Sequence, residues 1–558
     1  MLLMAGAVGV IAGVGAWGFR MLIGFVHNAL FLGSLTADYN ANMFTPASPW
    51  GMFVILVPVA GGLVVAWLVK NFAPEAKGHG VPEVMDAIYY NKGHIRPRVA
   101  IVKSLASAIS IGSGGSVGRE GPIVQIGSAF GSTLGAIFPM LVRDRVALIA
   151  AGAGAGIAAT FNAPLGGIVF AIELLLVSVN ARNLLVVSMA VVVATHIGHL
   201  LLGTDPSFYF AGLEVPDYPA HPPPLLLSFL VLGVVMGLVS VVFIRALYKM
   251  EDLFDAIPGN YYSRHALGML CVGVIMYILM QQAGHYYIEG VGYATIMEIL
   301  SGAVMSPWFL LMLAALKLLA TCLSLGSGAS GGVFSPALFM GATVGAAGGY
   351  LCQWLMPDTD ISIATFAIAG MAAAIAGTTG AVLTGMIMLA EMTRDYPSMM
   401  PMIITCTTAY AVRKAIMHES IYTMKLLARH HTVPEGLHSA ILTTERISDL
   451  MIRDFTVATT SDALPPGTTV VVPGENGVVE SVLVAADADE EKAVTHAVRY
   501  AIVPVQTAPL AALAILAETG AELILVSNQA SSQQANDIIG LLPTATLTRL
   551  LKSDELLS

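Results

Sequence analysis

Apolar runs long enough to enter a lipid bilayer recur about thirteen times before residue 430, and glycine or proline interrupts many of them. A spanning helix needs about 20 apolar residues, so several of these runs cannot span alone. Charged residues make up 11% of the chain, against about 25% in a soluble domain, which is too few to cover a water-facing surface. Broken backbone at membrane depth persists only where it is buried in protein or lines a wet cavity. The pattern predicts an all-α polytopic membrane protein with tilted and broken helices and a site built from helix ends.

The two ends of the chain differ in charge. The first apolar run begins at residue 2 without a basic segment ahead of it, which predicts a membrane helix over 2–30 and not a cleaved signal peptide. Residues 430–558 hold 16 acidic and 6 basic residues, and so account for the whole net charge of −10. We therefore expect a membrane domain over 1–430 and a separate domain over 431–558. Such an acidic tail argues against a nucleic-acid partner.

Basic residues also give an orientation. Lysine and arginine cluster over 413–429, directly before the acidic tail, whereas 33–49 contains neither. Because basic residues stay on the cytoplasmic side of a membrane, we expect the tail to be cytoplasmic.

Two segments of the membrane domain resemble each other. Residues 112–136 and 326–347 each contain GSG-x-S, further glycines, a proline, and then an apolar glycine-dotted helix. Corresponding positions lie about 214 residues apart, in opposite halves of the domain. Interrupted segments at matching places in two halves are a sequence indication of a transporter's binding site. The pattern predicts an internal repeat that places such a site between the halves.

Each of these segments predicts a helix that starts beside a proline, Pro122 in the first and Pro336 in the second. A third opening of the same kind has Gly78, Gly80 and Pro82. Proline suits the first helical turn, where the free N–H groups and the positive end of the helix dipole bind anions. Three such starts in one membrane domain predict a site where a halide is held without a full positive charge.

Glu120 is the candidate gate. It lies between Gly118, Arg119 and Gly121 at the start of a predicted helix, where its carboxylate would compete with an anion for the same N–H groups. A carboxylate at membrane depth is costly and usually functional. The alternative is a plain ion pair with Arg119, but adjacent residues on a helix do not face each other.

Other matches do not predict chemistry. GASGG (328–332) and GGSVG (114–118) fit a serine-nucleophile pattern, yet neither has the strand context or an identifiable His and Asp partner. The four cysteines lie apart in apolar runs, without metal spacing. We therefore expect no enzyme activity, no catalytic residue, no metal and no cofactor in the membrane domain.

Together these residues resemble the CLC family of chloride channels and chloride/proton exchangers. GREGP (118–122) resembles the family's gating-glutamate motif, GGVFSP (331–336) its anion-binding motif, and GHGVP (78–82) stands where GSGIP is usual. Three further segments match in order and spacing: 161–173, 380–396 and 419–427. The resemblance implies an inverted repeat, a homodimer with a pathway in each subunit, and bound chloride ions.

The resemblance also assigns roles by position. Glu120 would be the gate, and the backbone N–H groups near Gly332, Val333 and Phe334 would hold the central anion. Tyr422 would donate its phenol proton to that ion, although an aromatic residue at a membrane interface is the alternative.

Two positions depart from the family pattern. His79 replaces the usual serine; its imidazole could donate to the anion, or it could cap a helix without ion contact. Leu174 replaces the internal glutamate of proton-coupled relatives, which favours a channel-like pathway gated by Glu120. The alternative is a chloride/proton antiporter with a different internal proton route.

The tail contains segments similar to CBS domains, at 447–464, 510–528 and 537–551. TVVVPG and ELILVSN predict short buried strands, and the flanking patterns predict helices over 508–519 and 542–551. CBS pairs often bind adenine nucleotides, so such a ligand is an open expectation for a small cytoplasmic α/β domain. The remaining rivals are an organic-anion transporter and an intramembrane hydrolase. We place the protein in the plasma (inner) membrane of a prokaryote.

Overall fold

The computed structural model divides into two units. One comprises residues 1–176 and 180–436, and the other comprises 437–558 with the short segment 177–179. The ranges that the structure describes are 1–138, 140–176, 179–208, 223–429, 431, 433, 447–458, 469–474, 476–485, 495–507, 512, 515–516, 519–529 and 532–544.

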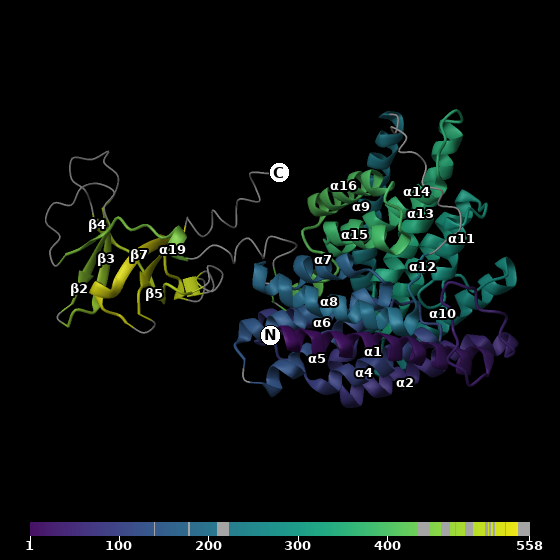
Figure 1. The fold of residues 1–558 in the computed structure, drawn as a ribbon, viewed down its shortest axis with the longest axis horizontal. Coiled ribbons are helices and arrows are strands. Elements are labelled where there is room, and N and C mark those ends of the chain that lie inside the picture. Colours follow the sequence, from purple (N-terminus) through teal and green to yellow (C-terminus); the bar gives the residue numbers. More distant parts are fainter. Residues whose placement is uncertain are drawn as a thin grey trace. The chain divides into compact units, whose positions relative to one another are not determined.

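The first unit is helical (Figure 1). Seven of its described helical segments are long and apolar enough to cross a membrane, and the others are shorter or more polar. The helices of its first half are α1 (Leu2–His27), α2 (Val57–Phe72), α3 (Val81–Tyr89), α4 (Pro97–Gly112), α5 (Glu120–Ile137), α6 (Val142–Phe161), α7 (Pro164–Leu174) and α8 (Ala181–Leu202). Those of its second half are α9 (Pro223–Ala256), α10 (Tyr261–Ala283), α11 (Tyr293–Leu300), α12 (Pro307–Ser327), α13 (Phe334–Leu355), α14 (Ile363–Thr379), α15 (Val382–Thr393), α16 (Met399–Ile416) and α17 (Thr423–Leu427). Short π or 3-10 turns occupy Asn28–Leu32, Gly51–Leu56 and Pro74–Ala76.

The repeat is visible in individual hydrogen bonds. The amide of Gly118 donates to the carbonyl of Gly332 at 2.7 Å, and the amide of Gly332 donates back to Gly118 at 2.6 Å. A matching exchange lies beside it: Ser330 N–H donates to Ser110 Oγ (3.3 Å), and Ser116 N–H donates to Ser324 Oγ (3.2 Å). In each pair of hydrogen bonds, the donor and acceptor of one bond are the repeat counterparts, about 214 residues away, of the donor and acceptor of the other. The two halves therefore face each other across a local two-fold axis.

Glycine allows the helices of each half to approach closely. Gly127 on α5 and Gly152 on α6 each leave no room for a Cβ against the other's carbonyl oxygen. Gly341 on α13 and Gly370 on α14 repeat the arrangement in the second half. Close backbone approach through small residues is a common way to pack helices in lipid, where no hydrophobic effect drives them together. The inverted repeat of tilted, broken helices is thus confirmed.

The second unit contains two small sheets with strands in the orders β1–β2–β3–β4 and β5–β6–β7. Its elements are α19 (Ile447–Leu450), β1 (Thr456–Val457), β2 (Thr469–Pro473), β3 (Val479–Ala485), β4 (Thr495–Ala497), β5 (Tyr500–Pro504), β6 (Leu523–Ser527), β7 (Ile538–Pro543) and a 3-10 turn at Ala535–Asp537. Strand β6 pairs parallel with β5 and antiparallel with β7. Leu523 and Leu525 enter one buried cluster and Ile524 and Val526 another, so β6 is covered on both faces.

Local predictions fared unevenly. The predicted membrane helix over 2–30 is α1, and the two predicted buried strands are β2 and β6. The predicted helix over 542–551 was wrong at its start, because β7 continues to Pro543 to pair with β6; the rest lies outside the described residues. The predicted helix over 508–519 also falls mostly outside them.

Candidate functional site

Four helices, α3, α5, α11 and α13, each begin after a glycine-rich loop, and their N-termini lie around one point between the two halves. Helix α5 begins at Glu120 and α13 at Phe334, next to the paired glycines Gly118 and Gly332. Helix α3 follows Gly80, whose φ is 84°, and α11 follows Gly292, whose φ is 78°. Positive φ values of this kind favour glycine, which explains the G-x-G spacing before both helices.

The Glu120 carboxylate lies on the start of α13. One oxygen accepts the backbone N–H of Ser335 at 3.2 Å, and the other accepts the Tyr293 hydroxyl at 2.8 Å. The Ser335 hydroxyl donates to it as well, and the residue is only 2% exposed. The carboxylate therefore occupies a place at a helix N-terminus that an anion would otherwise take.

Arg119 does not form an ion pair with Glu120 among the described residues. Its guanidinium lies over the rings of Phe161 and Tyr293, 5.4 and 5.2 Å from their centroids. The plain salt bridge, which was the alternative from sequence, is therefore not formed. Glu120 is held by neutral donors, the amide and hydroxyl of Ser335 and the hydroxyl of Tyr293.

The predicted anion-binding amides are of two kinds. The Gly332 amide is engaged by Gly118, so it is not free to bind an anion, and the expectation is corrected for this residue. The amides of Val333 and Phe334 have no acceptor within the described part of the chain. These two amides, at the N-cap and first residue of α13, are free to bind an anion.

The prolines and glycines of the three openings lie where the helix-start argument expects them. Pro82, Pro122 and Pro336 are buried in the first turns of α3, α5 and α13. At Gly121, a side chain would collide with the His79 carbonyl, so glycine there allows the loop before α3 to pack on α5. The carbonyl of Gly78 accepts Lys103 Nζ at 2.7 Å.

His79 and Tyr422 lie together on the other side of that loop. Both are buried, and their ring centroids are 6.0 Å apart. The Tyr248 hydroxyl donates to the Ile421 carbonyl at 2.6 Å and lies 3.4 Å from His79 Nε2. Because that hydroxyl has one proton, this hydrogen-bond network assigns the N–H of a neutral His79 ring to Nε2. His79 Nδ1 is then an unprotonated nitrogen, buried and without a partner among the described residues.

Glu173 has a structural partner and Leu174 has no group that can hold a proton. The Glu173 carboxylate accepts the N–H groups of Leu383 (3.1 Å) and Thr384 (2.8 Å) at the start of α15. Glu391 on α15 does the same for Leu165 and Gly166 at the start of α7, at 3.0 and 2.7 Å. Each glutamate caps the helix that carries the other. Leu174 is 6% exposed at the end of α7.

Two residues of the site were missed by sequence reasoning, Tyr293 and Ser335. Tyr293 directly follows a G-x-G in GVGY, the counterpart of GHGV before α3, and this likeness could have found it. Ser335 lies inside GGVFSP, yet its hydroxyl becomes informative only when Glu120 is placed against it.

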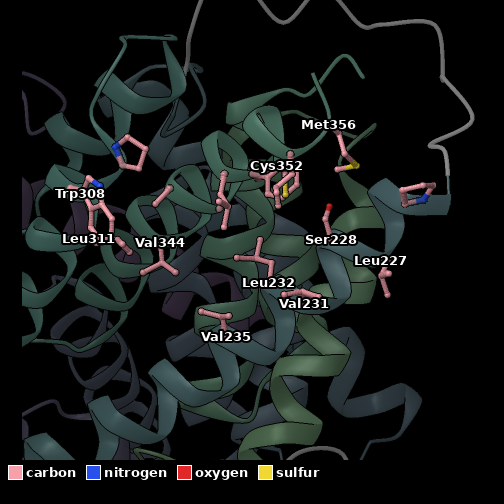
Figure 2. Close-up of a pocket in the computed structure, with 17 residues that line it drawn as sticks. Leu227, Ser228, Val231, Leu232, Val235, Trp308, Leu311, Val344, Cys352 and Met356 are labelled. Atoms are coloured by element: carbon pink, nitrogen blue, oxygen red, sulfur yellow. The ribbon is translucent and has the colours of Figure 1, made fainter. Parts of the chain in front are cut away.

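A separate cavity of the membrane unit is lined almost entirely by apolar side chains. It has a volume of about 600 Å³ and lies between α9, α12, α13 and α14. Figure 2 shows that Leu227, Val231 and Leu311 are among the apolar side chains that surround it. Such a wall offers almost no donor to an anion, so the site at Glu120 remains the functional candidate.

Helix N-termini that meet around a buried carboxylate, inside a multi-spanning repeat, define a membrane protein for anion transport. The chain belongs to the voltage gated chloride channel family, which residues 61–414 match. It is therefore a multi-pass protein of the chloride-transporting CLC family and not an enzyme.

Similar relatives include the H(+)/Cl(-) exchange transporter ClcA of two bacteria. The protein of Vibrio parahaemolyticus is 33% identical over 438 residues, which cover 76% of this chain and 89% of the relative. That of Yersinia pseudotuberculosis is 32% identical over 455 residues, which cover 80% and 91%.

Among solved structures, a slow cyanobacterial Cl−/H+ antiporter is 28% identical, with a TM-score of 0.67 over 77% of this chain and 97% of the other. A eukaryotic CLC transporter, 19% identical, has a TM-score of 0.62 over 97% of both chains and shows the fold alone.

Proposed function

We propose that this protein exchanges chloride for protons, with Glu120 as the gate that both ions share. The observation that carries the proposal is the carboxylate on the start of α13, bound to the Ser335 amide. A chloride that arrives there must displace the carboxylate, and a proton taken up by Glu120 weakens the carboxylate's hold on its donors. One residue thereby links the two fluxes.

The sequence favoured a channel because Leu174 removes the usual internal proton carrier. The named relatives, however, are proton exchangers, and they match most of the membrane unit. We therefore favour the antiporter reading, which requires an internal proton acceptor other than residue 174.

His79 is the acceptor that we propose. Its Nδ1 is a buried nitrogen without a partner in the described structure, and it can take a proton from the cytoplasmic side. Lys103 donates to the adjacent Gly78, and Lys425 lies beside the same residue, so a further positive charge is disfavoured. A chloride bound near Tyr422 would offset that repulsion. The proton would therefore bind to His79 Nδ1 at the same time as the anion binds. It would then pass from Nδ1 to the Glu120 carboxylate when the Glu120 side chain swings inward.

The test uses proteoliposomes with a chloride gradient, the membrane potential clamped by a potassium ionophore, and chloride and pH recorded together. We expect wild type to move protons uphill at a fixed ratio to chloride. Glu120→Gln should abolish proton movement while chloride continues. His79→Ser should lower proton flux by about tenfold or more, since one obligatory carrier is lost. Chloride flux without uphill proton movement in wild type would instead establish a channel.

Anion choice is a second readout of His79. A ring that donates to the ion should select differently from a serine hydroxyl. We expect His79→Ser to change the chloride/nitrate selectivity. Unchanged selectivity and coupling would leave His79 as a helix cap without ion contact.

The assembly and the tail are extensions of the same proposal. We propose a homodimer in the inner membrane of a prokaryote, with residues 431–558 as a cytoplasmic CBS-like domain. The family resemblance supports the dimer, and the basic cluster before the tail supports the orientation. Cross-linking in membranes tests the first, and protease access in inverted vesicles tests the second. Titration with ATP tests the expected adenine-nucleotide site.

A further inference from the structure

A polar pocket of about 240 Å³ lies next to Arg119, the neighbour of the gate. Its lining combines α1, the loop after it, α6, α8 and the segment that follows α8. The lining residues that bear on its chemistry are Arg20, Asn42, Arg119, Asn162, His199 and Asp205. Tyr293 and Ser335, which bond to the Glu120 carboxylate, do not line this pocket.

The two arginines of this pocket are available. In the part of the chain that the structure describes, neither guanidinium forms an ion pair or a hydrogen bond, although that of Arg119 also lies over the rings of Phe161 and Tyr293. Arg119 Nε is in addition buried without any partner there. Arginine rarely leaves its fork unused in a partly buried place, because an unsatisfied charged donor is costly.

The neutral groups of the lining are mostly occupied. Asn162 donates to the carbonyls of Thr204 and Asp205 at 2.8 and 3.1 Å, and its oxygen lies 2.5 Å from His199 Nε2. Asn42 donates to the Ser207 carbonyl at 2.9 Å. The Asp205 carboxylate also lines the pocket, but the two guanidiniums leave the lining with a net positive charge.

We propose that this pocket binds a small polyatomic oxyanion, of the phosphate or carboxylate class, between Arg20 and Arg119. A volume of about 240 Å³ is several times that of a water-sized ion, which occupies about 30 Å³, so a bare halide would leave it mostly empty. Two planar guanidinium forks match the oxygen pairs of an oxyanion. The lining offers little apolar surface to an acyl chain, so the ligand is a free ion. Since Arg119 precedes Glu120, the bound ion slows chloride entry past the gate.

The test measures binding first. Purified protein in detergent is titrated with sodium phosphate, and its melting temperature is compared with a sodium chloride titration of equal ionic strength. We expect phosphate to stabilise wild type with a saturable midpoint. Arg20→Gln should raise that midpoint by roughly tenfold or more, since a charged donor pair is lost. Arg182→Gln, which removes the same charge at the opposite end of α8, is the matched control and should bind as wild type does.

A second measurement keeps the proposal open to refutation if Arg20→Gln does not fold. Arg20→Lys retains the charge and removes the fork, and it should weaken phosphate binding by several-fold. In proteoliposomes, phosphate added outside should slow chloride flux in wild type and in Arg182→Gln, but not in the Arg20 variants. An unchanged midpoint in the Arg20 variants, or equal stabilisation by chloride, would overturn the oxyanion site.

Discussion

The two halves of the membrane unit share a scaffold and differ at the few positions that perform the chemistry. Gly118 and Gly332 bond to each other, and the glycine pairs of α5–α6 and α13–α14 are equivalent. The counterpart of Glu120 in the second half, however, is Phe334. One half therefore supplies the carboxylate, and the other supplies the Ser335 amide and the two hydroxyls that hold it.

The same asymmetry holds at the two G-x-G openings. Helix α3 begins with Val81 and α11 with Tyr293, so only the second opening supplies a hydroxyl to Glu120. His79 lies inside the first opening, where the second has Val291. A symmetric scaffold thus places helix starts at one point, and unlike residues on those starts give that point two chemically different sides.

The largest expected effect follows from removing the carboxylate of Glu120, whose counterpart in the second half is Phe334. Glu120→Gln cannot ionise, so chloride flux should persist and become independent of pH. Flux measured across the acidic range in proteoliposomes checks this. Wild-type pH dependence in the variant would remove Glu120 from the gate.

Glu173 and Glu391 are a pair in which the two halves are alike, because each glutamate caps the helix that carries the other. Glu173→Gln and Glu391→Gln should each destabilise the fold by about 1.5–3 kcal/mol, because a charged acceptor shared by two N–H groups is lost. Neither should alter the proton-to-chloride ratio. Thermal unfolding and the coupling assay measure both properties. Lost coupling in Glu173→Gln alone would make Glu173 a proton carrier and break the symmetry that we infer.

The sequence was sufficient for the scaffold and only in part for the site. Spacing between glycine-rich openings predicted the repeat, because close helix contacts and positive φ both favour glycine. Glu120 was predicted as a site residue because a carboxylate is conspicuous in an apolar segment, and the structure places it, buried, at the start of α13. Tyr293 and the engaged Gly332 amide were not predicted, since both depend on which backbone groups of distant segments meet, and local patterns do not encode such pairing.

A smaller effect is expected at Tyr293, which has no hydroxyl counterpart in the first half. Tyr293→Phe removes one hydrogen bond to a charged acceptor and should weaken the closed gate by about 1.5 kcal/mol. Chloride flux at neutral pH should shift upward by up to about tenfold, since chloride displaces a less firmly held carboxylate more readily. Tyr286→Phe is the matched control, because that hydroxyl accepts the Ser48 N–H instead. Equal shifts in both variants would contradict a specific role for Tyr293.

The smallest effect concerns an ion cluster that only the first opening has. Glu83 on α3 accepts Arg429 at 2.6 and 3.0 Å and lies 3.3 Å from Lys425, whereas the counterpart on α11 is Thr295. Burial opposes its ionisation, but Arg429 and Lys425 together lower the pKa of the Glu83 carboxyl below its usual value. A lowered pKa means that this contribution to stability is complete at neutral pH and is lost as the pH falls through the lowered value.

We therefore expect Glu83→Gln to lower the free energy of unfolding at pH 7 by about 1 kcal/mol or less, because Arg429 is partly exposed and the pair is screened. The difference from wild type should shrink as the pH falls through the lowered pKa of Glu83, where wild type also loses the charge. Melting temperatures of both proteins at pH 7 and at the lowest pH that preserves the fold provide the measurement. Glu75→Gln, which removes the carboxylate paired with Arg96, is the control for a general loss of negative charge. A difference that stays constant with pH would mean that Glu83 acts through packing, and that α3 is held to the segment before the tail by shape and not by charge.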